Sequence, residues 1–140
     1  MSSIIRKIIN TSKAPAAIGP YSQAVVVDRT MYVSGQLGMD PASGQLVEGG
    51  VQAQTKQALV NMGEILKEAG CGYDSVVKTT VLLADMNDFA SVNDVYKTCK
   101  RTSHSVHKVS LFPKRLSMFS AVASQRGLPT RSLLCPGVGL

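Results

Sequence analysis

One amphipathic helix, predicted between residues 51 and 69, limits this chain to folds in which a helix packs against a second layer. In that stretch apolar residues return at helical spacing, and polar residues fill the opposite side. Gly49-Gly50 breaks the chain before the helix, and Gly70 supplies its C-terminal stop. The apolar stripe comprises Ala58, Leu59, Met62, Ile65, Leu66 and Ala69, and the polar side comprises Gln54, Lys56, Gln57, Asn61, Glu64 and Lys67. Such a helix is stable only when its stripe is buried, so the chain must supply an apolar partner.

Runs of β-branched residues around this helix predict that partner to be a sheet. A short strand is expected within residues 3–10, a hairpin over 23–34 with its turn at Asp28-Arg29-Thr30, and a central strand over 75–84. Asp85 can cap a second helix whose inner face carries Phe89, Val92 and Tyr96. After residue 100 the pattern weakens, although 117–124 suits a strand, and the tail from about 128 is expected to be loose.

Helices alternating with strands on one side of a largely antiparallel sheet make an α+β domain. The length of 140 residues suits a single domain over 1–140. The sheet's other face would stay uncovered, and association with further copies of the chain is one way to bury it.

Composition excludes several classes of function. The longest apolar runs are a handful of residues, whereas a membrane span needs roughly 20, so no membrane partner is expected. The first residues have neither the apolar stretch nor the cleavage site of a secretory signal, which favours an intracellular protein. The three cysteines lack metal-ligand spacing. His104 and His107 lie three apart, but no carboxylate or cysteine accompanies them, so no metal site is predicted.

The excess of positive over negative charge lies entirely in the last third of the chain. Residues 1–98 carry eight Lys or Arg against nine Asp or Glu, whereas 99–140 carry seven Lys or Arg and no acid. Such a split is typical of a nucleic-acid-binding arm, or of a segment that the rest of the fold no longer constrains. Phe112 and Phe119 are the only aromatic residues there, and no RNA-binding motif places them for base stacking.

Three short stretches hold the candidate functional residues. Gly19 and Pro20 stiffen the chain before Tyr21, whose phenol either donates a hydrogen bond into a cleft or is a rim aromatic in water. Ser34-Gly35 in a strand interior either admits a ligand close to the backbone or marks a simple bulge. Asn93 in the second helix either orients a substrate group or water, or is an exposed polar residue.

Together these stretches resemble the RidA family, also called YjgF/YER057c/UK114. The resemblance covers about residues 1–98 and rests on four motifs. They are Ala-Ile-Gly-Pro-Tyr-Ser-Gln-Ala at 17–24, Tyr-Val-Ser-Gly-Gln-Leu-Gly-Met-Asp-Pro at 32–41, Lys-Thr-Thr-Val-Leu-Leu-Ala-Asp-Met-Asn-Asp-Phe at 78–89 and Val-Asn-Asp-Val-Tyr at 92–96.

The resemblance implies a chorismate-mutase-like α+β fold, with two helices on one face of the sheet, assembled as a homotrimer with active sites between subunits. It implies a cytoplasmic hydrolase, with mitochondrial or nuclear pools as alternatives, that deaminates 2-iminobutanoate and 2-iminopropanoate to 2-keto acids and ammonia without cofactors. Tyr21 and Asn93 match the family's catalytic residues, and Ser34 and Gly35 match its substrate contacts.

The last third departs from the family at two positions that carry chemistry. His104 stands where the family has an Arg that clamps the substrate carboxylate, and Met118 stands where it has a Glu that handles the water. A neutral His replaces only part of a bidentate Arg, so a weakened deaminase is expected, with His104 as its remaining carboxylate contact. The alternatives are an RNA-binding translation inhibitor of the ribonuclease type, also implied by the resemblance, and a catalytically inactive diverged copy.

Overall fold

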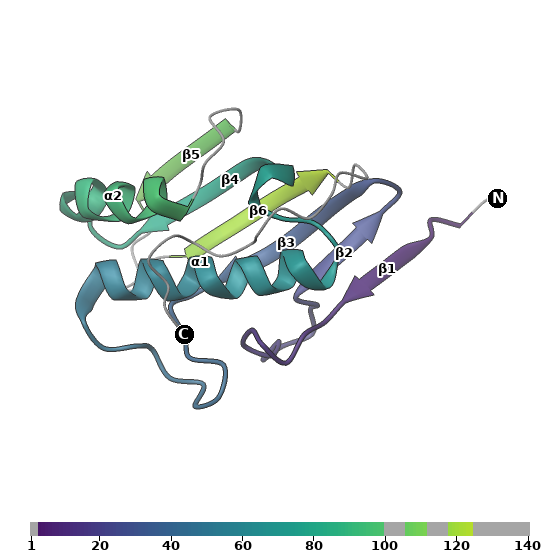
Figure 1. The fold of residues 1–140 in the computed structure, drawn as a ribbon, viewed down its shortest axis with the longest axis horizontal. Helices are drawn as coiled ribbons and strands as arrows, with labels where there is room; N and C mark the ends of the chain where they lie inside the picture. The colour runs from purple at the N-terminus through teal and green to yellow at the C-terminus, as the bar shows by residue number, and fades with distance from the viewer. Residues whose placement is uncertain (1–2, 100–105, 112–117, 125–140) are drawn as a thin grey trace.

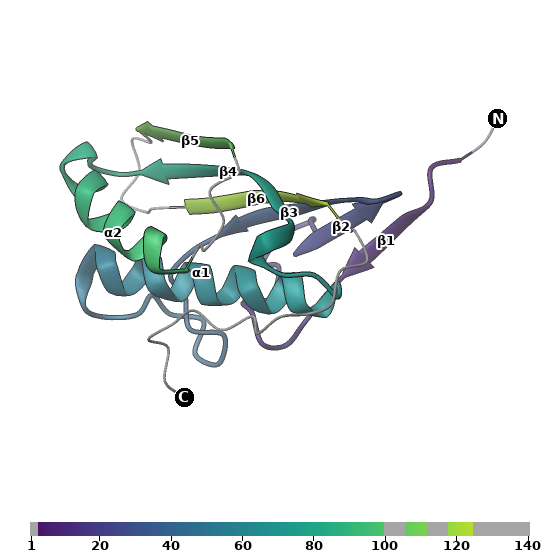
Figure 2. The ribbon, with the colours of Figure 1, turned by 45° about the horizontal axis from the view of Figure 1, so that its top comes forward.

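Within residues 3–99, 106–111 and 118–124, which the computed structural model describes, the chain forms a six-stranded sheet with two helices on one face (Figures 1 and 2). The strands follow the order β1-β2-β3-β6-β4-β5, and only the pair β4–β5 is parallel. The α+β class predicted from the sequence is confirmed. The elements are β1 (Arg6–Ile9), β2 (Ala24–Val27), β3 (Thr30–Gln36), α1 (Gly50–Glu68), η1 (Tyr73–Ser75), β4 (Val76–Leu83), η2 (Met86–Asp88), α2 (Phe89–Cys99), β5 (Val106–Leu111) and β6 (Met118–Ser124).

Helix α1 buries the stripe that its sequence predicted. Met62, Ile65 and Leu66 are at most 1% exposed, and they share one apolar core with Met31 of β3 and Leu83 of β4. Burying a side chain of this size fully contributes about 1.5–3 kcal/mol, so the stripe is the main reason why this helix forms. The helix ends as expected, because Gly70 takes a positive φ of 76° that other residues rarely adopt.

Helix α2 differs from its prediction at one residue. Asp85 does cap, but it accepts the Asn87 N–H at 2.9 Å in the short turn η2 that leads into α2. Val92 is buried and Tyr96 half-buried, whereas Phe89 is 42% exposed. The prediction for Phe89 was therefore wrong, because Phe89 is the first residue of α2 and lies at its end rather than along the face toward the sheet.

The last described strand, β6, lies in the middle of the sheet. It pairs with β3 on one side and β4 on the other, both antiparallel (Figure 1). The predicted strand over 117–124 is confirmed, and β5 is the second strand expected after residue 100. The predicted loose tail from about residue 128 lies outside the described residues, and the single domain over 1–140 stays a prediction.

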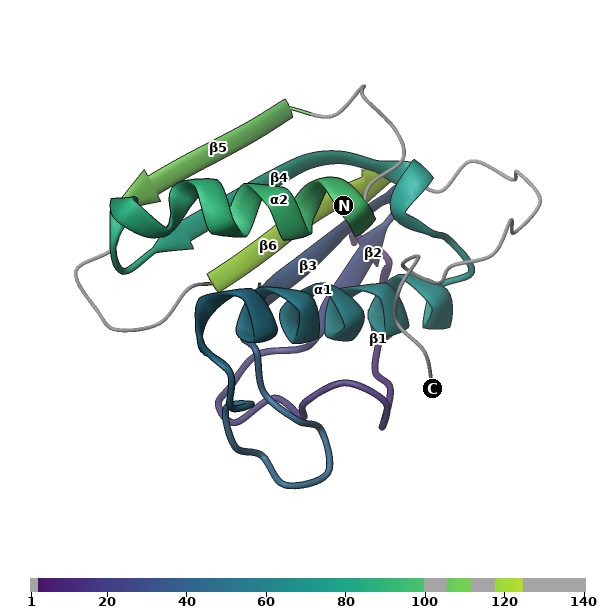
Figure 3. The same cartoon turned by 60° about the vertical axis from the view of Figure 1, so that its left-hand side comes forward.

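The helices leave the other face of the sheet open. Figure 3 shows α1 and α2 side by side over one face, with the strands behind them. On the open face the register aligns Ile8, Val25, Tyr32 and Val122 across four strands. Ile8 is 65% exposed and Tyr32 55% exposed. This cross-strand row, here called the apolar row, therefore holds apolar surface that the described residues leave in solvent.

No helix in the described ranges combines the length and the apolar composition needed to cross a lipid bilayer.

Candidate functional site

The loop before β2 holds Tyr21 in a tight turn. The Tyr21 N–H donates to the Gly19 carbonyl at 2.8 Å, and the Tyr21 hydroxyl accepts the Ile18 N–H at 3.4 Å. The ring folds back over Gly19, where a Cβ would lie only 3.0 Å from a ring carbon. The side chain is 51% exposed. Because the hydroxyl acts as an acceptor toward Ile18, its own proton stays available for a ligand.

Ser34 fastens this loop to β3. Its hydroxyl oxygen lies 2.6 Å from the Ser22 carbonyl and 2.7 Å from the Gln23 carbonyl, and its N–H donates to the Gln23 carbonyl at 3.0 Å. The pairing of β3 with β6 shifts between Val33 and Gln36, so the bulge considered for this stretch is present. The Ser34 proton is thus used within the protein, and only the lone pairs of its oxygen remain for a ligand. Its role in substrate binding stays a prediction.

Tyr21 and Gly35 line the same pocket. Its volume is about 50 Å³, well below the roughly 300–1,000 Å³ of drug-sized ligand sites. The lining residues carry no formal charge, so the described part of this pocket offers no cation to a carboxylate. By itself the pocket is therefore too small to enclose a ligand of that size. The lining comprises Pro15, Ala16, Ala17, Ile18, Tyr21, Gln23, Gly35, Gln36, Leu37 and Met39.

Of the other predicted site residues, those that the structure describes do not line this pocket. Asn93 lies on α2, half-buried, and is not among the lining residues. Ser34 adjoins the pocket through its bonds to Ser22 and Gln23 but does not line it. His104 lies outside the described residues, and Met118 begins β6.

Two buried carboxamides beside the pocket were missed by sequence reasoning. Gln23 is 2% exposed, and Asn61 is 0% exposed although it was assigned to the polar side of the helix. The Asn61 amide donates to the carbonyls of Leu37 and Met39 at 3.1 and 2.8 Å. Helical spacing held a signal, because Asn61 lies three residues after Ala58 and so adjoins the apolar stripe. Nothing in the sequence marked Gln23 beyond its place in a motif.

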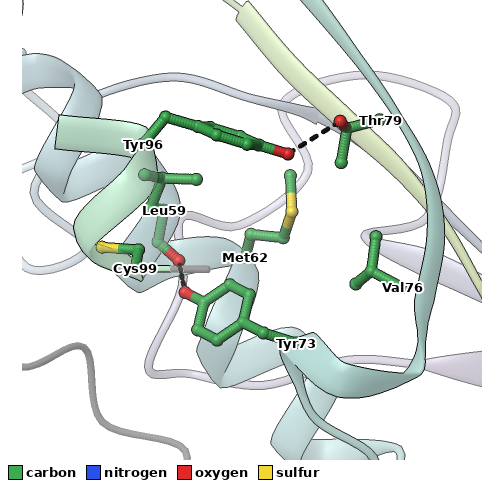
Figure 4. A pocket seen from close by; sticks show the side chains of 7 residues that line it. All are labelled: Leu59, Met62, Tyr73, Val76, Thr79, Tyr96 and Cys99. Atoms are coloured by element: carbon green, nitrogen blue, oxygen red, sulfur yellow. Dashed lines mark hydrogen bonds between the residues drawn. The ribbon is translucent and has the colours of Figure 1, made fainter. Parts of the chain in front are cut away.

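A second, smaller cavity lies between α1, α2 and β4 (Figure 4). The hydroxyls of Tyr96 and Thr79 lie 2.8 Å apart, and the Tyr73 hydroxyl donates to the Leu59 carbonyl. Burial raises the pKa of both tyrosines, so both hydroxyls stay protonated at neutral pH. The volume of about 10 Å³ reaches at most the roughly 10–15 Å³ that one water needs. This cavity is a packing gap in the core and has no room for a substrate.

The fold and the pocket together define a class: small α+β proteins in which a stiff tyrosine loop and a bulged strand line one pocket. The chain belongs to the family described as Endoribonuclease L-PSP, whose model matches residues 11–118, and the resemblance to the RidA family is thereby confirmed.

Individual relatives agree with this assignment. The chain is 62% identical over 138 residues to 2-iminobutanoate/2-iminopropanoate deaminase of Bos taurus, covering 95% of this chain and 100% of the relative. Crystal structures of RidA from an Antarctic Psychrobacter species and of E. coli TdcF with bound serine superpose with TM-scores of 0.82 and 0.80. Their sequence identities are 36% and 33%, and the matches cover 85% and 86% of this chain and 99% of each of theirs.

Proposed function

We propose that this protein hydrolyses 2-iminobutanoate and 2-iminopropanoate to the corresponding 2-keto acids and ammonia. The observation that carries the proposal is the full-length similarity to the bovine protein named for that activity. The pocket adds support, because the hydroxyl proton of Tyr21 is available to a ligand and Gly35 lines the same pocket. The substrate class is therefore a small, anionic 2-imino acid.

The reaction needs water, proton transfers and correct placement. Water adds to the electrophilic imine carbon, so that the carbon gains a hydroxyl group and the nitrogen a proton. The nitrogen then takes up a second proton, the carbon–nitrogen bond breaks to release ammonia, and the hydroxyl proton returns to the donor as the keto group forms. In the proposal Tyr21 serves as the proton donor, and Gly35 and the Ser34 oxygen orient the substrate. Because Asn93 does not line this pocket in its own chain, the proposal has Asn93 of a neighbouring copy hold the water. His104 contacts the carboxylate in place of an arginine, which makes this a weakened site.

Replacing Tyr21 by Phe is expected to slow this reaction about tenfold or more, because a positioned proton donor contributes roughly 10²–10⁴-fold in a fully equipped site. The measurement is keto-acid formation from 2-iminobutanoate generated in situ by a threonine dehydratase. Tyr32→Phe is the matched control, since Tyr32 is a similarly exposed tyrosine on the open face of the sheet. Equal rates for Tyr21→Phe and the unaltered chain would remove Tyr21 from the mechanism.

The proposal includes a homotrimer that buries the apolar row and completes the pocket from a neighbouring copy. A glutamate at position 32 would place a charge in that interface, at a cost of several kcal/mol. Sedimentation should therefore give three times the 14.9 kDa chain mass for the unaltered protein and a monomer for Tyr32→Glu. Met86→Glu, on the helix side and 46% exposed, is expected to stay trimeric. A monomeric unaltered chain that still turns over would contradict the assembly.

RNA cleavage or binding, with inhibition of translation, is the second candidate, favoured by the family's description and by the basic last third. It would appear as steeply salt-dependent RNA binding that weakens when Arg126 and Arg131 are replaced by Gln. Deleting residues 99–140 is not a usable test, because it removes the central strand β6. Either activity is proposed for the cytoplasm.

A further inference from the structure

The carboxamide of Gln23 ties an irregular segment of the chain to the start of β2. Its Oε1 accepts the Thr11 N–H at 2.7 Å, and its Nε2 donates to the Thr11 carbonyl at 3.0 Å. The same nitrogen lies 3.3 Å from the Ala14 carbonyl and 2.9 Å from the Pro15 carbonyl. Paired bonds to both backbone groups of Thr11 reproduce what a neighbouring strand would supply. The side chain thus continues the β1–β2 pairing beyond the end of β1.

Gln23 has no N–H group left to donate to an acceptor atom of a substrate. A carboxamide carries two N–H donors, and here three carbonyls share them. The side chain is also 2% exposed, although it lines the pocket that contains Tyr21. Because its N–H groups are used and the side chain is buried, we expect its effect on a reaction in that pocket to pass through the segment that it holds.

That segment leads directly to Tyr21. On its N-terminal side the chain is held at Ala14 and Pro15 by the Gln23 side chain, and on its C-terminal side the Ser22 and Gln23 carbonyls accept from Ser34. Residues 16–21 span the two anchors, and Pro20 restricts the backbone just before Tyr21. The position of the phenol therefore depends on both anchors.

We propose that Gln23 is a positioning residue for Tyr21, which it places for proton donation without touching the substrate. The inference rests on the deaminase function proposed above. A shift of about 1 Å in a reacting group costs up to roughly 10²-fold in rate, so the loss of this anchor should act on kcat more than on KM.

A double-mutant cycle tests the proposal. Gln23→Met keeps the length of the side chain and removes all its hydrogen bonds, and we expect kcat to fall about tenfold with KM within about twofold. Because Gln23 acts through Tyr21, the double variant Gln23→Met, Tyr21→Phe should be no slower than Tyr21→Phe alone. If the losses in kcat of the two single variants instead multiply in the double variant, the proposal fails, because Gln23 then acts independently of Tyr21.

Asn61 provides the matched control. It too is a buried carboxamide that donates to two carbonyls, but these belong to Leu37 and Met39, which line the pocket without leading to Tyr21. Asn61→Leu should lose stability by a similar mechanism, and its effect on kcat should multiply with that of Tyr21→Phe. If Asn61→Leu shows the same non-additivity as Gln23→Met, the coupling reflects general loosening of the pocket and the proposal fails.

If Gln23→Met does not fold, Gln23→Asn is a second variant that tests the same proposal. The shorter side chain retains the carboxamide, so it can keep its hydrogen bonds only if residues 11–15 move by about one bond length, roughly 1.5 Å. We expect a folded protein with kcat reduced about tenfold or more. An Asn variant with unchanged kcat and an unshifted loop would contradict the proposal.

Hydrogen exchange tests the role of Gln23 independently of the proposed deaminase function. Loss of the Gln23 acceptor should speed exchange of the Thr11 amide at least tenfold, while amides within α1 keep their rates. If the unaltered chain gives no turnover above buffer, the proposed function fails, and the Thr11 amide still shows whether Gln23 holds the segment. If exchange of the Thr11 amide is unchanged in Gln23→Met, the Gln23 side chain does not hold this segment. The proposal then fails whether or not the chain turns over the substrate.

Discussion

The double variant His104→Arg, Met118→Glu is expected to hydrolyse 2-iminobutanoate about 10²–10³-fold faster than the unaltered chain, the size of effect that one well-placed charged or polar group typically has on kcat. In the proposed site, an arginine at 104 would form a bidentate clamp on the substrate carboxylate, which a histidine cannot form. A glutamate at 118 would supply a base for the water. Keto-acid formation coupled to a threonine dehydratase measures both rates under the same conditions.

Two controls make this result specific to position. His107→Arg adds the same charge three residues further on, and Met118→Gln adds a polar group without a carboxylate. Neither is expected to raise the rate more than about twofold, because neither provides a charged partner at the required place. A similar gain from these controls, or no gain from the double variant with its fold and assembly intact, would show that the two departures from the family do not limit this site.

Replacing Gly38 by Ala is expected to destabilise the protein by about 3 kcal/mol, the upper part of the range for overpacking. A Cβ at this position would lie 2.4 Å from both the Cα and the carbonyl oxygen of Gln54 in α1, and backbone atoms cannot move aside as a flexible side chain can. The Asn61 amide holds the carbonyls on either side, at Leu37 and Met39, so the strain cannot relax locally. Urea unfolding at matched protein concentration measures the loss.

Gly44→Ala is the control that distinguishes the cost of steric crowding from the cost of an unfavourable backbone conformation. Gly44 has a positive φ of 68°, but nothing lies within 4 Å of the Cβ that would be added. Its replacement should therefore cost only about 1 kcal/mol, from the unfavourable φ alone. If Gly38→Ala proves no worse than Gly44→Ala, the close approach of residue 38 to α1 contributes little to stability.

The elements with strong local patterns could be predicted from the sequence. The stripe in α1, the β-branched run of β4 and the hairpin of β2 and β3 each carry their own period, and the structure places each within two residues of the expected bounds. Local features marked Tyr21 and Gly35 as candidates, because Gly19 and Pro20 stiffen the loop and Gly35 sits at a bulge, but their place in one pocket depends on the pairing of β2 with β3. Local geometry is what a sequence pattern records most directly.

Features that depend on distant partners could not be predicted in the same way. Gln23 and Asn61 are buried because each satisfies carbonyls elsewhere in the chain, between 8 and 24 residues away. A polar side chain is assigned to solvent by any pattern of hydrophobicity, since such a pattern does not contain its hydrogen-bond partners. The central place of β6 could not be predicted either, because its neighbours β3 and β4 lie far from it in sequence.

The place of β6 also sets the order in which this molecule can be completed during synthesis. The ribosome releases β3 and β4 long before β6, yet these two strands are joined only through it. Until then a nascent chain carries two half-sheets with unpaired inner edges, which are templates for pairing with other chains. The strand that joins them begins at Met118, one of the two positions where the sequence is expected to depart from the family. Substitutions in β6 are therefore expected to act late in folding, when the two half-sheets join.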